Sequence, residues 1–316
     1  MRFLHNTHID FLSKRRFFYL MSAALIALGA AIFMVKGIPL GIDFKGGTEL
    51  LVRFDKPVEI QNVRDAMDIA GLMGSEIKTM GDVRDILIKT AQEGEGTTVA
   101  DNIKEGLKSS FPDNNFEVLR IDKVGPKIGK ELRMSAVYAT VFSLIAILIY
   151  LAFRFEFVYA VGAVVGLFHD VLITIGMVAI FHALFPSLNL ELSQTMVAAF
   201  LTLIGFSSND TVIVFDRIRE NIKLYKNEDI LVVMNRSINT TLSRTIITSG
   251  TVFVTVLILF LFGGEVNSGF AFTFLVGVVT GTYSSVYISS ALVVDIKYAQ
   301  KRRRSLKAAS VVTGKA

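Results

Sequence analysis

The sequence predicts a polytopic α-helical membrane protein that carries one small α/β domain outside the membrane. The first observation is composition: of the 316 residues, 52% are hydrophobic and only 19% are charged, whereas soluble proteins carry about 25% charged residues. The second is that the apolar residues gather in long runs, and the third is a single long polar stretch between the first two runs. These features exclude a disordered chain and an ordinary soluble enzyme.

Six apolar runs have about the length that a membrane helix needs, which is about 20 residues for a hydrocarbon core of about 30 Å. We expect membrane-spanning helices at 17–35, 134–153, 157–185, 192–215, 246–262 and 270–294. The first run begins like a signal peptide, but its length and the five spans after it indicate a retained signal-anchor. The chain then divides into an N-terminal segment, a first span, a polar domain, a five-helix bundle and a basic tail, at 1–16, 17–35, 36–133, 134–295 and 296–316.

The positions of Lys and Arg predict the orientation. These residues concentrate in the N-terminal segment, between the fourth and fifth spans, and in the tail, whereas the short loops 186–191 and 263–268 contain none. Because basic residues near span ends remain in the cytosol, we expect both termini to be cytosolic and domain 36–133 to lie outside. A polybasic tail next to a span is typical of a topology and anionic-lipid signal, so we expect no nucleic-acid partner.

Hydrophobic periodicity within 36–133 predicts a ferredoxin-like domain with the order βαββαβ. Alternating apolar residues indicate strands and amphipathic stripes indicate helices; the strands are expected at 49–54, 76–80, 84–89 and 116–124, and the helices at 58–71 and 98–111. The domain contains no His and no metal-ligand cluster, and the chain has no Cys. We therefore expect a binding or moving module rather than an active site, with no cofactor and no metal.

Two glycine-bearing segments bracket this domain where it meets the membrane. The first follows span 1 and the second precedes span 2; their residues are Asp43, Phe44, Gly46 and Gly47, and Gly125, Pro126 and Gly129. Glycine and proline at such positions are typical of turns, and small residues at the ends of elements are also typical of hinges. Both interpretations remain open at this point.

Polar residues inside the spans point to a functional site, because a charge in a membrane helix is costly. Asp170 lies in the third span, and Asp210 lies in the fourth beside Asn209, within a polar cluster at 207–211. Arg244 opens the fifth span from the same side, so it is placed to approach Asp210 as a partner or a gate. Two roles are open: a buried ion pair that locks the bundle, or a carboxylate that takes up and releases a proton.

Small residues at four-residue spacing predict close helix packing in two spans. The pairs are Gly162 with Gly166 in the third span, and Gly277 with Gly281 in the sixth. The sixth span also has a polar side, which is typical of a helix that lines the interior of a bundle.

The motifs together resemble the SecF branch of the bacterial SecD/SecF family, within the resistance-nodulation-division superfamily. The resemblance covers residues 10–295 and is carried by Asp43-Phe44-x-Gly46-Gly47, Val124-Gly125-Pro126-x-x-Gly129 and the run from Ser208 to Asn221. It implies a multi-pass protein of the cytoplasmic (inner) membrane that pairs with SecD, attaches to the SecYEG channel and uses the proton-motive force to promote preprotein translocation. It also implies a proton path through Asp210 and Arg244, with Asn209 beside it and Asp170 in support, and no hydrolytic chemistry.

Three other functions fit parts of the sequence. A half-transporter for a small molecule or lipid would share the spans, but such exporters carry much larger external domains. An intramembrane aspartyl protease would also use two membrane aspartates, but the Gly-x-Gly-Asp run expected of that class is missing. A passive membrane scaffold would use Asp210 and Arg244 only as a structural pair. Sodium stays open as the coupling ion in place of the proton.

Overall fold

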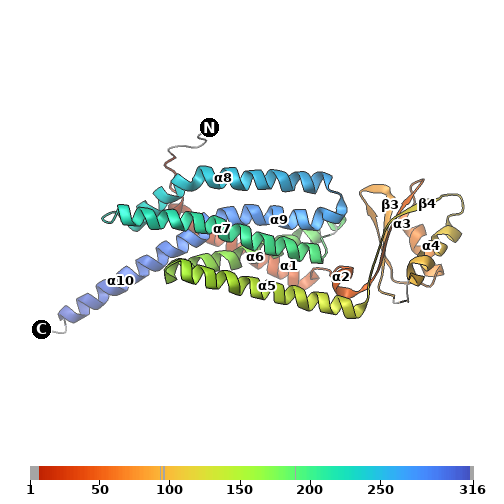
Figure 1. Ribbon diagram of the computed structural model, residues 1–316, viewed down its shortest axis with the longest axis horizontal. Helices are drawn as coiled ribbons and strands as arrows, with labels where there is room; N and C mark the ends of the chain where they lie inside the picture. Colours follow the sequence, from red (N-terminus) through yellow and green to blue (C-terminus); the bar gives the residue numbers. More distant parts are fainter. Residues whose placement is uncertain (1–6, 93, 95–96, 189, 314–316) are drawn as a thin grey trace.

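The structure is a computed structural model that describes residues 7–92, 94, 97–188 and 190–313. A bundle of long helices forms one part of the molecule, and a small α/β domain caps one end of it (Figure 1). The start of the first long helix and the end of the last lie at the end of the bundle away from this domain. Because the chain enters and leaves the bundle at the same end, it crosses the bundle an even number of times.

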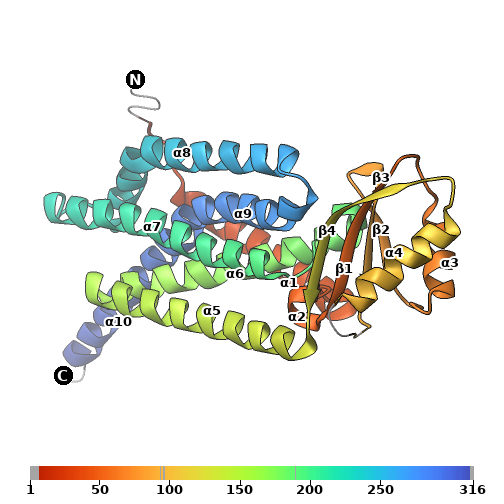
Figure 2. The same ribbon diagram turned by 45° about the vertical axis from the view of Figure 1, so that its right-hand side comes forward.

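The external domain has the predicted βαββαβ order. Its elements are β1 (Gly47–Phe54), α3 (Ile60–Ile69), β2 (Glu76–Met80), β3 (Asp82–Thr90), α4 (Thr98–Ser110) and β4 (Phe116–Val124). The strands form one antiparallel sheet in the order β2-β3-β1-β4. Helices α3 and α4 cover its outer face, so that the sheet lies between these helices and the bundle (Figure 2). The prediction of a ferredoxin-like domain is confirmed.

The domain core forms where the amphipathic stripes meet the sheet. Val63 and Met67 of α3 and Ile103 and Leu107 of α4 are completely buried against strand residues such as Leu50. Each buried aliphatic side chain contributes about 1.5–3 kcal/mol of hydrophobic free energy. Such a core is adequate for a domain of this size.

The bundle contains α1 (Arg15–Lys36), α5 (Pro126–Arg154), α6 (Phe157–Leu184), α7 (Gln194–Leu224), α8 (Ile230–Phe262), α9 (Glu265–Ser284) and α10 (Ala291–Thr313). A π-helical segment, η3 (Ser285–Ser290), joins α9 to α10 in one continuous run. In the described part of the chain, six helical stretches are long and apolar enough to cross a membrane, judged by length and composition. This number agrees with the six predicted spans.

Helices α7 and α8 extend well beyond the predicted spans 192–215 and 246–262. The residues between these spans form a helical hairpin with a short turn rather than a long loop. Asp229 caps α8 by accepting a hydrogen bond from the Leu231 amide at 2.9 Å. Asn221 of α7 donates to Ser237 of α8 at 2.8 Å in a buried position. The charged residues between the two spans indicated a loop, but they lie on the outer faces of the hairpin, where they are compatible with helix.

The segment before α1 is tied to the N-terminal part of α8. The side-chain oxygen of Asn235 accepts hydrogen bonds from the backbone amides of Phe11 and Leu12, both at 3.1 Å. Asn239 exchanges two hydrogen bonds with the backbone of Ile9, at 3.0 and 2.8 Å. We call residues 9–12 the N-terminal strap. It fixes the beginning of α1 to the hairpin of α7 and α8.

Helix packing confirms that the glycine pairs allow close approach. A Cβ atom on Gly277 would lie 2.6 Å from a methyl group of Leu203, and one on Gly281 would lie 3.0 Å from the Cβ of Ser207. Likewise, a Cβ on Gly162 would lie 2.7 Å from a methyl group of Val293. The third and sixth spans therefore use their small residues to bring α6 against η3 and α10, and α9 against α7.

Helices α1 and α6 approach even more closely at Gly29 and Gly176. An added Cβ on Gly29 would lie well inside 3.0 Å of the Gly176 Cα atom, and one on Gly176 would lie 3.2 Å from the Gly29 Cα atom. The two backbones are therefore in direct contact at this crossing, as small residues in membrane helices allow.

Candidate functional site

Asp210 is buried between three helical elements. It projects from α7, with 6% of its surface exposed. One carboxylate oxygen accepts a hydrogen bond from Thr245 of α8 at 3.0 Å, and the other accepts one from Ser285 of η3 at 2.8 Å. Both donors are hydroxyl groups, so the carboxylate is held by neutral dipoles rather than by a cation in direct contact.

Asp170 forms a second buried carboxylate site on α6, with 1% of its surface exposed. Its Oδ2 atom accepts hydrogen bonds from Ser207 of α7 and from Ser284 of α9, the latter at 2.8 Å. Its Oδ1 atom lies 3.0 Å from Nδ1 of His169. The residue is therefore part of a hydrogen-bond cluster that draws on three helices.

Ser284 and Ser285 bring the two carboxylates into one site. They are consecutive residues, yet Ser284 binds Asp170 on α6 while Ser285 binds Asp210 on α7. The π-helical turn η3 begins at this point, and single π turns within helices are frequent at functional sites. Close packing at Gly281 holds α9 against α7. The resulting assembly of Asp170, Asp210, His169 and the hydroxyl groups that hydrogen-bond to these three residues is here called the aspartate cluster.

The structure does not bring Arg244 and Asn209 into this cluster. Arg244 is exposed, and the neighbouring Thr245 contacts Asp210 in its place. Consecutive residues on an α-helix point about 100° apart, so only one of the two faces α7 in this conformation. Asn209 is also exposed, on the outer face of α7. The expected direct contact between Asp210 and Arg244 is therefore not formed here.

Several cluster residues were not predicted as site residues. Ser22 of α1 and Tyr283 of α9 reach His169 from two sides, with oxygen-to-Nε2 distances of 2.9 Å each. A single serine in an apolar span carries no periodic signal, so Ser22 could not be identified from the sequence. Tyr283, Ser284 and Ser285 lie in the polar side of the sixth span, which was a usable signal. Among the described residues, no group of three or more His, Asp or Glu is arranged to hold a metal ion.

The aspartate cluster lies between two groups of apolar side chains on α7. On the side of the α/β domain, α7 places Met196, Leu203 and their apolar neighbours in a buried core with α9. On the other side, Val214 and Ile218 join a second buried core with the hairpin. Buried apolar clusters therefore lie along α7 on both sides of Asp210.

The two glycine-bearing segments meet where the domain joins the bundle. Gly46 has a positive φ of 80°, and a Cβ on it would lie 2.9 Å from the Cα of Pro126, which is the first residue of α5. A Cβ on Gly129 would lie 3.0 Å from the Gly46 amide nitrogen. The glycines thus serve a tight turn and a close contact between the two segments, whereas a hinge motion stays a prediction.

Asp43 links this junction to the helix that carries Asp210. Its carboxylate accepts a hydrogen bond from the backbone amide of Gln194, the first residue of α7, at 2.9 Å. The preceding chain also pairs with the loop before α7, through the Gly41 amide to the Leu192 carbonyl at 3.0 Å and the Leu192 amide to the Pro39 carbonyl at 2.8 Å. The N-terminus of α7 is therefore held by the base of the external domain.

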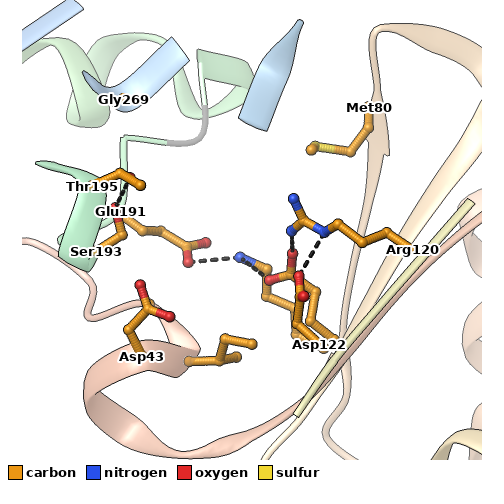
Figure 3. A pocket seen from close by; sticks show the side chains of 12 residues that line it. Asp43, Met80, Arg120, Asp122, Glu191, Ser193, Thr195 and Gly269 are labelled. Carbon is orange, nitrogen blue, oxygen red and sulfur yellow. Dashed lines mark hydrogen bonds and ion pairs between the residues drawn. The ribbon is translucent and has the colours of Figure 1, made fainter. Parts of the chain in front are cut away.

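An ion-pair network surrounds a polar cavity of about 250 Å³ beside this junction (Figure 3). Glu191, from the loop before α7, is 8% exposed and pairs with Lys89 of β3 at 2.6 Å and Lys78 of β2 at 3.3 Å. Lys89 also pairs with Glu49 of β1 at 3.2 Å, and Glu49 accepts a further hydrogen bond from Arg120 of β4. The network joins the sheet to the membrane base, and sequence periodicity gave no sign of it.

Comparison with known proteins agrees with this architecture. The family model described as "Protein export membrane protein SecD/SecF, C-terminal" matches residues 103–299, and the model "SecD/SecF GG Motif" matches residues 31–58. The chain is 43% identical to the protein translocase subunit SecF of Rhodothermus marinus, covering 98% of this chain and 100% of that protein. It is 42% identical to the SecF subunit of Calditerrivibrio nitroreducens, covering 94% and 97%.

A solved structure shares the fold as well. The crystal structure of SecDF, a translocon-associated membrane protein from Thermus thermophilus, superposes with a TM-score of 0.82 at 37% identity. The match covers 94% of this chain and 40% of the longer SecDF chain. Together with the six apolar helices, these relatives make the protein a multi-pass protein of a bacterial membrane. The chain belongs to the SecD/SecF family of protein export membrane proteins, on its SecF branch.

Proposed function

We propose that this chain is a subunit of the Sec protein-export complex and uses the proton-motive force to promote preprotein translocation across the cytoplasmic membrane. It acts in a heteromeric complex with a SecD subunit and with the SecYEG channel, and it performs no hydrolytic chemistry of its own. The observation that carries this proposal is Asp210, a buried carboxylate held by hydroxyl groups from two other elements.

Protonation of Asp210 changes the contacts among three elements. A charged carboxylate accepts both hydrogen bonds, from Thr245 and from Ser285, whereas a protonated carboxyl group must itself donate one. Burying the charged form without a cation is costly, so loss or gain of the proton favours different packing of α7, α8 and η3. A proton crossing the membrane gains about 2.3 kcal/mol per 100 mV, which biases a two-state equilibrium about fifty-fold.

Arg244 supplies the second state of this motion. It precedes Thr245 on α8, and a rotation of that helix by one residue, about 100°, exchanges Thr245 for Arg244 opposite Asp210. The arginine then stabilises the charged carboxylate, while the threonine binds Asp210 in the conformation described above. Asn209, on the exposed face of α7, lies beside this path, and Asp170 supports Asp210 through the shared serines.

Movement of α7 reaches the external domain through Asp43. Because Asp43 caps the first turn of α7 and Glu191 pairs with the sheet, a shift of α7 is transmitted to the domain that faces the emerging preprotein. Both termini are cytosolic in this proposal. The exposed basic side chains near the end of α10, Arg302, Arg303 and Arg304, support that orientation.

The test is export of a slowly translocated preprotein into inverted membrane vesicles, with and without an imposed proton gradient. Asp210→Asn preserves size but cannot titrate, so it should insert normally and lose the gradient-dependent part of export, as should Arg244→Ala. Asp210→Glu should retain part of it. The matched control is Asp216→Asn on the same helix, which removes only a partly exposed ion pair with Arg154.

Four outcomes separate the alternatives. A full gradient response in the Asp210→Asn variant would contradict proton coupling at this residue. A response to a sodium gradient in place of a proton gradient would identify the other ion. A double variant, Asp210→Asn with Arg244→Gln, that exports normally would establish a passive scaffold, and gradient-driven uptake of a small molecule or lipid without preprotein would establish a half-transporter.

A further inference from the structure

His169 is the one histidine within the aspartate cluster, and it is 7% exposed. Its Nδ1 atom lies 3.0 Å from Asp170 Oδ1, and its Nε2 atom lies 2.9 Å from both Ser22 Oγ and the Tyr283 hydroxyl. Those two hydroxyl groups are 3.1 Å apart. Every polar atom of the ring therefore has a partner, and the partners come from α1, α6 and α9.

The charged and titratable groups that face this ring are few. From its own helix there is Asp170, from α9 there is Tyr283, and from α7 there is Asp210, which is reached through the neighbouring serines. Within the described chain, no Lys or Arg side chain makes a hydrogen bond or ion pair with His169 or Asp170. The imidazole is thus the single group in contact with Asp170 that is able to carry a positive charge.

We propose that His169 and Asp170 form a second proton-holding pair, coupled to Asp210, and that Ser22 and Tyr283 are positioning residues for the imidazole. This inference rests on the proposed function. With Nε2–H donating to a hydroxyl oxygen, Nδ1 is free to accept a proton from Asp170. Transfer breaks the O–H bond of the carboxyl group and forms an N–H bond at Nδ1. The pair changes from two neutral groups to imidazolium and carboxylate, with no change in total charge.

Coupling to Asp210 follows from the shared serines. Release of a proton from the pair leaves a net negative charge in the bundle, next to the site where Asp210 deprotonation also places one. Two interacting buried acids titrate as a unit, so a negative charge at the His169–Asp170 pair disfavours a negative charge at Asp210, and the reverse also holds. Uptake of a proton at one of these two sites is thereby linked to release of a proton at the other. His169 also allows Asp170 to ionise without a cation from elsewhere in the protein.

The test uses the full chain in lipid nanodiscs with isotope-labelled histidine. The chain has only 4 His, so their ring signals are resolved by nuclear magnetic resonance, and His169→Gln assigns the one of interest. In the Asp170→Asn variant the imidazolium signal of His169 should weaken, because the carboxylate that stabilises imidazolium is gone. Asp210→Asn should shift the same signal by a smaller amount. His182, on the same helix, serves as the control and should not change.

Export measurements complete the design. His169→Gln should lower gradient-dependent export at least tenfold and change its pH profile, whereas His182→Gln should do neither. Tyr283→Phe, which leaves Ser22 as an acceptor, should give a milder change in the same direction. If His169→Gln does not fold, the imidazolium signal of His169 in Asp170→Asn decides the matter.

The inference is overturned if the imidazolium signal of His169 is the same in the unchanged chain and in Asp170→Asn, or if a folded His169→Gln variant keeps both rate and pH profile. Such a result, with export lost in Asp210→Asn, leaves the proposed function standing. A normal gradient response in Asp210→Asn refutes the proposed function instead, whatever the ring signals show.

Discussion

Replacing Gly29 by alanine should force apart the two helices that Ser22 and His169 join. The new methyl group would lie well inside 3.0 Å of the Gly176 Cα atom, and backbone atoms have no flexible end to move aside. The reverse change, Gly176→Ala, places the methyl group 3.2 Å from the Gly29 Cα atom, so a much smaller adjustment is sufficient. Overpacking of this kind costs about 1–3 kcal/mol, and we expect Gly29→Ala near the upper end and Gly176→Ala near the lower.

Gly205 of α7 provides the matched control, because among the described residues no atom beyond its own helical turn lies within 4 Å of a Cβ built there. Gly205→Ala should leave stability unchanged or raise it by about 0.5–1 kcal/mol through helix propensity. The chain has no Trp, so stability is measured as the fraction that remains monodisperse by gel filtration after heating in detergent. Each kcal/mol shifts the midpoint by about 2–4 °C. A midpoint for Gly29→Ala at or above that of Gly205→Ala would refute the close crossing of α1 and α6.

Three further changes test other contacts. Glu191→Gln should weaken the contact between the external domain and the bundle by about 1.5–3 kcal/mol, because Lys89 loses one of its two charged partners. Limited proteolysis of the domain should then accelerate. Asn235→Ala should release the N-terminal strap and raise the rate of chymotrypsin cleavage within it, after Phe11 or Leu12, up to about tenfold, since each lost cap costs about 1 kcal/mol. The Arg84 side chain and amide lower the pKa of Asp82 from 3.8 to about 2. The charged Asp82 carboxylate therefore stabilises the fold above about pH 4, and this contribution is lost as the pH falls through about 2. Asp82→Asn should remove this part of the dependence of fold stability on pH. Circular dichroism at a series of pH values measures it.

The external domain was predictable because each of its elements carries its own periodic signal. The stripe of Val63 and Met67 and the alternation of Ile86 and Ile88 are set by burial on one face, and the structure buries those faces. The ends of α7 and α8 were not predictable in the same way. Their charges indicated a loop, but the pattern could not show that buried contacts such as Asn221 with Ser237 continue the helices.

The candidate site was predicted in part. Asp170 and Asp210 were identifiable because charge inside a span is costly wherever it points. The Thr245 contact was not, because sequence position alone does not fix the rotation of α8, and the choice between Thr245 and Arg244 depends on it. Ser22 and Glu191 act through tertiary contacts with partners far away in the sequence, and such contacts have no local signature.

The π-helical turn after Ser284 makes the length of this segment as important as its composition. A π turn holds an additional residue compared with an α turn, and the run Ser285–Ser290 supplies it. Deleting one residue there would restore regular α geometry and rotate everything that follows by about 100°. Asp295 would then turn away from Arg15, with which it pairs at 2.9 Å, although not one side chain of the aspartate cluster had been altered. Across natural variants, substitutions in this turn should therefore be far more frequent than insertions or deletions.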